Sequence, residues 1–369
     1  MTASATLVPR KGSWRGVAIA VLLFLLVPFI PQLRAMFPIE QTLVLLIAVI
    51  ASCMIVGWRQ GGRLLLALIW VVLAVAFIAG PSLPAGAHTA FLDRTWGVTS
   101  PTAYTTLARG WVVLLAASFG LVNLFSGAQS FISRALSTVA LAGGLGFILV
   151  LLSPGGPARI SGTMALEYTR RNDESIAMIR AAAASSAAAK GKPDAQGIER
   201  FDQVVEEQII EIGKTSAGLV PAILTLESLA AMALAWSLYH RLNPTPLGPA
   251  LGRLRDFRFN DQLVWGVAVG ASIYLLPQFA EARNAGLNIL VFFGALYVLR
   301  GFGILSWIAK GRILQLVLVF IASFVISAVL AYRMGFLIAP AFPVIALAFA
   351  LGLGDTWLDW RNLLQPKTV

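Results

Sequence analysis

Glu227 is the residue whose position points most directly to chemistry, because it is the only acid near the centre of an apolar run long enough to cross a membrane. A charged side chain there opposes insertion by about 2.5–3.5 kcal/mol, so acids inside spans commonly mark solute sites or proton relays. Glu227 could bind a cationic or hydroxylated substrate, or take up and release a proton. The structural alternative is a hydrogen bond between helices, or an ion pair with a buried base such as Arg300.

Two amides, Asn123 and Asn288, are the other polar side chains near the centres of apolar runs. Together with Glu227 they are candidates for lining a substrate-binding site within a helix bundle. The alternative is that each amide makes a hydrogen bond between helices, a contact worth only about 1 kcal/mol in a membrane.

A charged motif is expected at the cytoplasmic surface. Asp355 and Asp359 are four residues apart, so in a continuous helix both carboxylates would face one side. Paired carboxylates can hold Mg²⁺ against a diphosphate, but the sequence has no second acidic cluster at this depth. We favour ion pairs with Arg258 or Arg361, and we assign Asp256 to the same motif.

Signatures of soluble catalytic sites do not occur in the sequence. It has no nucleophile elbow, no Walker sequence and no zinc-protease sequence. A single cysteine excludes an intrachain disulfide, and two histidines argue against a zinc site. We therefore expect a protein that is not an enzyme and that carries no metal and no cofactor.

The composition is that of an integral membrane protein. Of the 369 residues, 58% are hydrophobic and 12% are charged, whereas about 25% are charged in an ordinary soluble domain. Several apolar runs reach the roughly 17–25 residues that a helix needs to cross a bilayer. The runs do not alternate with a period of two, which argues against an outer-membrane barrel. We expect an all-α polytopic transmembrane bundle whose main partner is the lipid bilayer.

Apolar runs bounded by charged residues, glycine or proline predict about ten spans. The first run continues past the length of a signal core, and no small-x-small cleavage site follows it before Arg34, so we expect it to be retained. The predicted spans are 16–37, 40–57, 63–79, 110–126, 135–153, 216–239, 263–280, 285–306, 313–334 and 336–354.

Basic residues predict the orientation of these spans. Alternate short segments, beginning with the amino terminus, carry 14 Lys and Arg residues, and the opposite short segments carry 5. Positively charged short loops remain in the cytoplasm, so both termini are expected to be cytoplasmic in a bacterial inner membrane. Much of the net charge of +11 is thereby a topology signal, and nucleic acid is not an expected partner.

A long segment, 154–215, interrupts the apolar runs and is nearly neutral. We expect it to form two helices outside the bilayer, over 162–190 and 195–213. The second helix has an apolar stripe from Ile198 to Ile212, which could cover the bundle, lie on the membrane or bind a partner protein. The sequence thus divides into an amino-terminal bundle of about five spans (1–153), the extramembrane helical segment (154–215) and a carboxy-terminal bundle of about five spans (216–369).

The second half of the chain carries a set of short motifs, which are Pro221, Asp256–Phe259, Leu263–Trp265, Leu287–Leu290, Arg300–Phe302 and Gly354–Arg361. Together they resemble the YybS-like family of bacterial membrane proteins, most clearly from about 200 to 362. This family has no established activity. Its organisation is distantly similar to the substrate-binding components of energy-coupling-factor transporters and to the cell-shape protein MreD, a likeness of fold that assigns no ligand.

The leading hypothesis is that the protein binds or moves a small solute within its bundle. The second is a non-catalytic membrane scaffold for envelope biogenesis, which recruits a membrane protein partner. The third is a lipid-processing enzyme that uses Asp355 and Asp359. A cavity enclosing Glu227 would favour the first hypothesis, and a tightly packed bundle with a large apolar face outside lipid would favour the second.

Our first prediction concerns topology. The bias in basic residues predicts that both termini and the loop 241–262 are cytoplasmic. Cysteines introduced at positions 250 and 365 should therefore resist an impermeant thiol reagent in intact cells. Labelling of either position in intact cells would contradict the predicted orientation.

Overall fold

The structure is a computed structural model that describes residues 14–26, 38–39, 42–80, 102–125, 129–190, 217–243, 246–308 and 342–363. Within these ranges the chain forms helices and turns and no β-strand, which confirms the predicted all-α bundle. The chain divides into two compact units, unit 1 (Met1–Leu251) and unit 2 (Gly252–Val369). This division differs from the three segments expected from the sequence, because the helix after the 154–215 segment packs with the amino-terminal helices.

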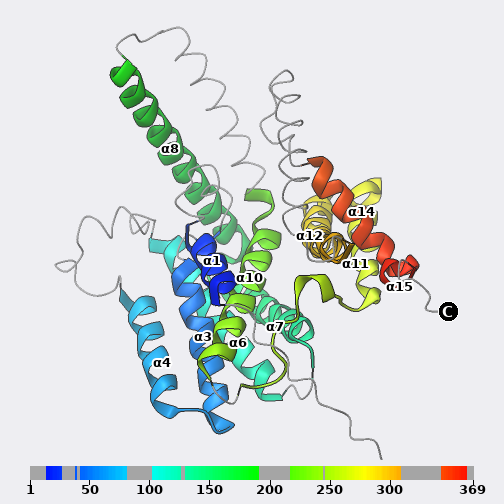
Figure 1. The fold of residues 1–369 in the computed structure, drawn as a ribbon. Helices are drawn as coiled ribbons and strands as arrows, with labels where there is room; N and C mark the ends of the chain where they lie inside the picture. Colours follow the sequence, from blue (N-terminus) through cyan, green and yellow to red (C-terminus); the bar gives the residue numbers. More distant parts are fainter. Residues whose placement is uncertain are drawn as a thin grey trace, which may run out of the picture. The chain divides into compact units, whose positions relative to one another are not determined.

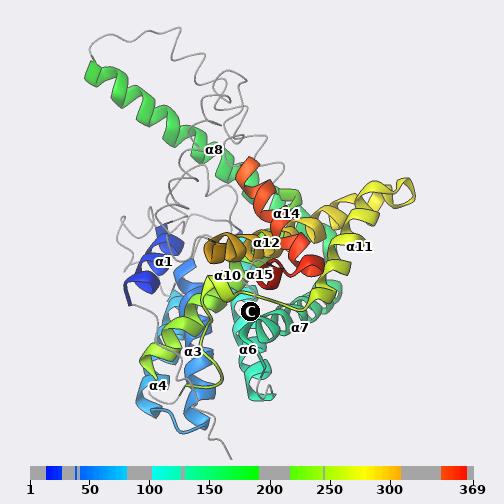
Figure 2. The same ribbon diagram turned by 45° about the vertical axis from the view of Figure 1, so that its right-hand side comes forward.

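Unit 1 is drawn from blue to yellow-green in Figures 1 and 2. Its helices match the predicted spans closely, although the fourth begins eight residues earlier than expected. The helix expected over 162–190 is present as part of the longer Gly156–Lys190 helix, and its place outside the bilayer stays a prediction, whereas the second expected helix, over 195–213, lies outside the described residues. The helices of unit 1 are α1 (Trp14–Leu26), α3 (Thr42–Arg59), α4 (Leu64–Ala79), α6 (Thr102–Phe125), α7 (Phe131–Leu152), α8 (Gly156–Lys190) and α10 (Val220–Leu242).

Five helices in the described residues are long and apolar enough to cross a membrane. Three shorter apolar helices accompany them, α1, α4 and the segment Val344–Leu358. The predicted span 313–334 lies outside the described residues. The five long segments are Thr42–Arg59, Tyr104–Phe125, Phe131–Leu152, Val220–Leu242 and Pro277–Ile308.

Helix α3 is the centre of unit 1. Most of its side chains are buried, and it packs against α4, α6 and α10. Helices α4 and α7 instead expose large apolar side chains, such as Leu65 at 72% and Leu152 at 78% of their surface. A water-soluble core would bury such side chains, whereas a bilayer solvates them. Unit 1 therefore has the surface of a membrane bundle around one central helix.

The basic segments of unit 1 gather at one end of the bundle, which we call the basic end. There the amide of Asn243 approaches Gly57 and Gly62 at the end of α3, and the guanidinium of Arg134 approaches Gly248. Arg59, Arg63 and Arg241 belong to the same connections. The opposite ends of α6, α7 and α10 also meet, as described below. This is the alternation that the predicted topology requires, and the side of the membrane that each end faces stays a prediction.

Unit 2 is built on three helices, α11 (Val264–Leu275), α12 (Arg283–Ile308) and α14 (Phe342–Leu358), followed by the short α15 (Trp360–Leu363). Helix α12 packs between α11 and α14. The predicted span 263–280 is wrong at its end, because α11 stops at Leu275 and a 3₁₀ segment with Pro277 at its start leads into α12. Proline lacks the N–H that would continue the ladder of α11.

Glycines bring α12 and α14 into backbone contact. A Cβ added at Gly301 would overlap the carbonyl oxygen of Ala348, and one added at Gly352 would overlap that of Tyr297. Small residues permit this close approach, and close packing is a principal attraction between helices in lipid.

We predict that Gly301→Ala destabilises unit 2, because the methyl group must push α14 away from α12. Overpacking of this kind costs about 1–3 kcal/mol. The matched control is Gly294→Ala in the same helix, where an added Cβ meets nothing within 4 Å. Both changes alter helix propensity equally, so thermal unfolding in detergent should show a lower midpoint for Gly301→Ala alone. Equal midpoints for the two variants would contradict the close contact.

Candidate functional site

Three helices hold a short piece of non-helical backbone, Pro38–Ile39, at the end of unit 1 opposite the basic end. The hydroxyl of Tyr104 in α6 donates a hydrogen bond to the carbonyl oxygen of Pro38. Arg171 Nη2 in α8 donates to the same oxygen over 3.2 Å. The N–H of Ile39 donates to Glu227 Oε2 in α10 over 3.1 Å. The carbonyl oxygen of Pro38 and the N–H of Ile39 belong to one peptide group, and both are therefore satisfied by side chains, as buried backbone groups usually are.

The guanidinium of Arg171 contacts one carboxylate and two aromatic rings. Its Nε donates to Glu167 Oε1 over 2.9 Å, and its guanidinium carbon lies 4.9 Å from the ring centroid of Tyr104 and 5.6 Å from that of Tyr168. Arg171 is 1% exposed and Glu167 is fully buried. Burial alone would raise the pKa of Glu167, but the hydrogen bonds and charges of Arg170 and Arg171 outweigh it and hold the pKa below its ordinary value.

Buried polar atoms near this peptide have no hydrogen-bond partner among the described residues. They are Glu227 Oε1, the hydroxyl oxygen of Tyr168 and Asn172 Oδ1. Burial raises the pKa of Tyr168, and the negative charges of its neighbours, including Glu227, act in the same direction. We call Tyr104, Glu167, Tyr168, Arg171 and Glu227 the polar centre.

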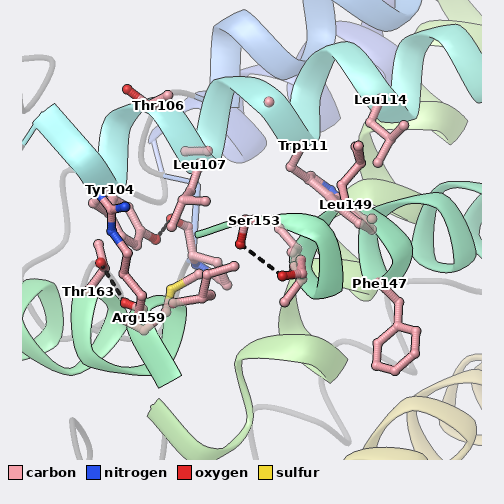
Figure 3. Close-up of a pocket in the computed structure, with 18 of the residues that line it drawn as sticks. Tyr104, Thr106, Leu107, Trp111, Leu114, Phe147, Leu149, Ser153, Arg159 and Thr163 are labelled. Atoms are coloured by element: carbon pink, nitrogen blue, oxygen red, sulfur yellow. Dashed lines mark hydrogen bonds between the residues drawn. The ribbon is translucent and has the colours of Figure 1, made fainter. Parts of the chain in front are cut away.

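A cavity of about 730 Å³ adjoins the polar centre and lies between α6, α7 and the first turns of α8 (Figure 3). Ile39 and Tyr104 belong both to the cavity wall and to the contacts of the polar centre, whereas Glu227 lies behind the wall. The cavity is lined by Pro38, Ile39, Tyr104, Thr106, Leu107, Ala108, Gly110, Trp111, Leu114, Gly143, Gly146, Phe147, Leu149, Val150, Ser153, Pro154, Arg159, Ile160, Thr163, Met164 and Leu224.

The cavity wall is apolar except at one side. Figure 3 shows Tyr104, Arg159 and Thr163 together on that side, and Phe147, Leu149 and Leu114 on the other. The hydroxyl of Ser153 donates to the carbonyl oxygen of Val150 over 2.8 Å, and that of Thr163 donates to its own helix over 2.9 Å. Their hydrogens are thus engaged, so these oxygens can accept a hydrogen bond from a ligand.

Of the predicted site residues in unit 1, the structure brings only Glu227 to this region. Glu227 is the eighth residue of α10, about two turns from its beginning rather than at the centre of the span. Asn123 lies near the basic end, where its Oδ1 accepts from Arg134 Nη1 over 2.8 Å and its amide nitrogen donates to the carbonyl oxygen of Phe119 over 2.7 Å. Asn123 therefore ties α6 to α7 and does not line the cavity.

Arg300 does not form the pair with Glu227 that the sequence left open. It belongs to unit 2, where its Nε donates to Asp355 Oδ2 over 2.9 Å and its Nη1 donates to Asp261 Oδ1 over 2.6 Å. Asn288 also belongs to unit 2, and its amide nitrogen donates to the carbonyl oxygen of Asn284 one turn earlier, over 2.7 Å.

The predicted surface motif forms ion pairs. Arg258 Nη2 lies 2.6 Å from Asp359 Oδ1, which confirms that predicted pair. The expectation that Asp355 and Asp359 share one helical face is wrong, because α14 ends at Leu358 and Asp359 has a φ of 38°, outside the right-handed helical region.

The remaining residues of the motif lie around the same ion pairs. Arg361 Nη2 donates to the carbonyl oxygen of Phe257 over 3.1 Å, and Asp256 lies 3.6 Å from the exposed Arg255. Burial lowers the pKa of Arg361, although the charge of Asp355 opposes this effect.

Residues 164–339 match a family model described as "Predicted membrane protein (DUF2232)". The match includes Glu167, Arg171 and Glu227 of the polar centre but not Tyr104. Together with the apolar helices, this match supports an integral membrane protein of unknown function. No curated protein and no solved structure is significantly similar to the chain.

Sequence reasoning missed Tyr104, Glu167 and Arg171. Glu167 and Arg171 carry a local signal, since opposite charges four residues apart face each other on a helix. Nothing local marks that pair as buried, because α8 is polar overall. Tyr104 had no comparable signal, and its helix begins before the predicted span.

We predict that Glu227→Gln leaves stability almost unchanged, because the amide oxygen can still accept from Ile39. Glu227→Ala should lower the free energy of unfolding by about 1–3 kcal/mol, since it leaves a buried N–H unpaired. Thr225→Ala in the same helix controls for loss of a polar side chain that bonds only within its own helix. Unfolding in detergent measures all three variants. An equal loss in Gln and Ala would mean that the negative charge, rather than the acceptor oxygen, holds the peptide.

Proposed function

We propose that this integral membrane protein binds a small, largely apolar solute in the cavity of unit 1, and that it acts by binding rather than by catalysis. The observation that carries the proposal is the cavity itself. Its volume of about 730 Å³ lies within the range of about 300–1,000 Å³ that is typical of small-molecule sites. Such sites are mostly apolar with a few placed polar groups, which describes this wall.

The wall beside the polar centre is held in place before any solute arrives. Pro38 and Ile39 are fastened to α6, α8 and α10 by hydrogen bonds from or to three different side chains. A fixed wall reduces the ordering cost of binding. In this proposal Glu227 supports the site by positioning Ile39, and it does not contact the solute.

The other two hypotheses have less support. A lipid-processing enzyme would need Asp355 and Asp359 to be available for a metal, but Arg300 and Arg258 engage these carboxylates. A scaffold would recruit partners through the 154–215 segment and the loop around Arg253–Arg258, and residues 191–215 of that segment lie outside the described residues.

We further propose that the basic end faces the cytoplasm of a bacterial inner membrane, with both termini on that side. The bias in basic residues supports this orientation. The polar side of the cavity, at the opposite end of unit 1, would then face away from the cytoplasm.

Native mass spectrometry of the purified protein tests the binding proposal. Gly143 lines the cavity and an added Cβ there meets nothing within 4 Å, so Gly143→Leu should fill the space without displacing the backbone. The matched control is Gly144→Leu, one residue along α7, where an added Cβ also meets nothing and which is not part of the cavity wall.

We expect a co-purifying small molecule on the wild type and on Gly144→Leu, and a loss of roughly tenfold or more in its occupancy on Gly143→Leu. The same bound species at the same occupancy on both variants would place the molecule elsewhere and refute the proposed function.

A further inference from the structure

The charge of the cavity wall is the feature that selects a class of solute. Among the described residues that line the cavity, Arg159 is the only charged one, and none of them carries a carboxylate. A cation would therefore meet a wall without a countercharge, whereas an anion would meet a guanidinium with fixed donor geometry.

Arg159 is available to a ligand. Its side chain is exposed, and its Nη1 contacts the carbonyl oxygen of Pro154 only at 3.5 Å, the outer limit of a hydrogen bond. No acid of the described residues forms an ion pair with it, whereas Arg170 and Arg171 on the same helix are both paired with Glu167.

Helix α8 adds positive potential at the same place. It begins at Gly156, three residues before Arg159, and runs for 35 residues. The amino-terminal end of a helix carries a partial positive charge that favours anions. Gly155 has a φ of 84°, and a Cβ there would lie 3.0 Å from the stem of Arg159. Because Gly155 has no Cβ, the aliphatic part of the Arg159 side chain can pack against the turn beside the cavity.

The other side of the cavity suits a hydrocarbon chain. Leu114, Phe147 and Leu149 lie there, away from Arg159 (Figure 3). They belong to α6 and α7, the apolar helices that flank the cavity.

From this separation of charge and apolar surface, we infer that the solute is an anionic amphiphile. Its phosphate or carboxylate contacts Arg159 at the start of α8, and its hydrocarbon chain lies against α6 and α7. This inference rests on the proposed function and deepens it by naming the ligand class.

The test is a titration of the purified protein in a non-ionic detergent, followed by native mass spectrometry. The probes are dioctanoyl phosphatidic acid, dioctanoylglycerol with the same chains and no phosphate, and inorganic phosphate with no chain. The variants are Arg159→Gln, Gly143→Leu and Arg180→Gln. The last is a control that removes one exposed positive charge from α8 outside the cavity wall.

We expect the wild type to bind the phosphatidic acid at least about tenfold more tightly than the diacylglycerol, the effect of one charge-assisted hydrogen bond. Arg159→Gln should abolish this preference and leave diacylglycerol binding unchanged, while Arg180→Gln retains the preference. Gly143→Leu should weaken binding of both lipids.

The possible failures are distinguishable. Equal binding of both lipids that Gly143→Leu abolishes would overturn the anionic class and leave the proposed function standing. Binding that Gly143→Leu does not change would overturn both. Inorganic phosphate could also bind as tightly as the phosphatidic acid and lose this binding in Arg159→Gln. That result would show a site for phosphate alone and overturn the inference that the ligand is an amphiphile.

Discussion

The Pro38–Ile39 peptide is the constraint around which unit 1 is organised. Buried backbone outside a helix must find hydrogen-bond partners in the protein, because an unpaired buried N–H or C=O costs free energy. Tyr104, Arg171 and Glu227 supply these partners from α6, α8 and α10. The same contacts tie this peptide to the first turn of α6, to a point about two turns into α10 and to the middle of α8. The cavity between α6, α7 and α8 adjoins this peptide.

The buried charges of Glu167 and Arg171 form an ion pair, and this pair also contacts a second element. Glu167 lies one turn before Arg171, and their contact neutralises both side chains inside the fold. The guanidinium is then free to reach the carbonyl oxygen of Pro38 with a second nitrogen. Removing one member of such a pair costs far more than the pair itself contributes, so buried pairs of this kind fix a geometry more than they add stability. In unit 2, Arg300 and Asp355 join α12 to α14 in the same way.

The two chemical environments of unit 1 are separated by one layer of residues. Ile39 and Tyr104 face the cavity and at the same time contact the polar centre. This layer keeps Glu227 and Glu167 out of the cavity wall, which leaves Arg159 as its charged residue. The selectivity that we infer for anions thus depends on where acids are hidden as much as on where the arginine is exposed.

The sequence alone determined the class of fold, the positions of most spans and the alternation of basic segments, because hydropathy and loop charge are local properties of the chain. It also narrowed the basic partner of Asp359 to Arg258 or Arg361, and the structure selects Arg258. Tertiary structure decided what Glu227 contacts, where Arg300 finds its acids and where the cavity lies. These depend on which helix faces become neighbours, and the hydropathy of a span that is apolar on every side does not encode its neighbours. Tertiary structure also decided that the chain divides after Leu251. Helix α10 belongs to unit 1 because it packs against α3, which is far from it in the sequence.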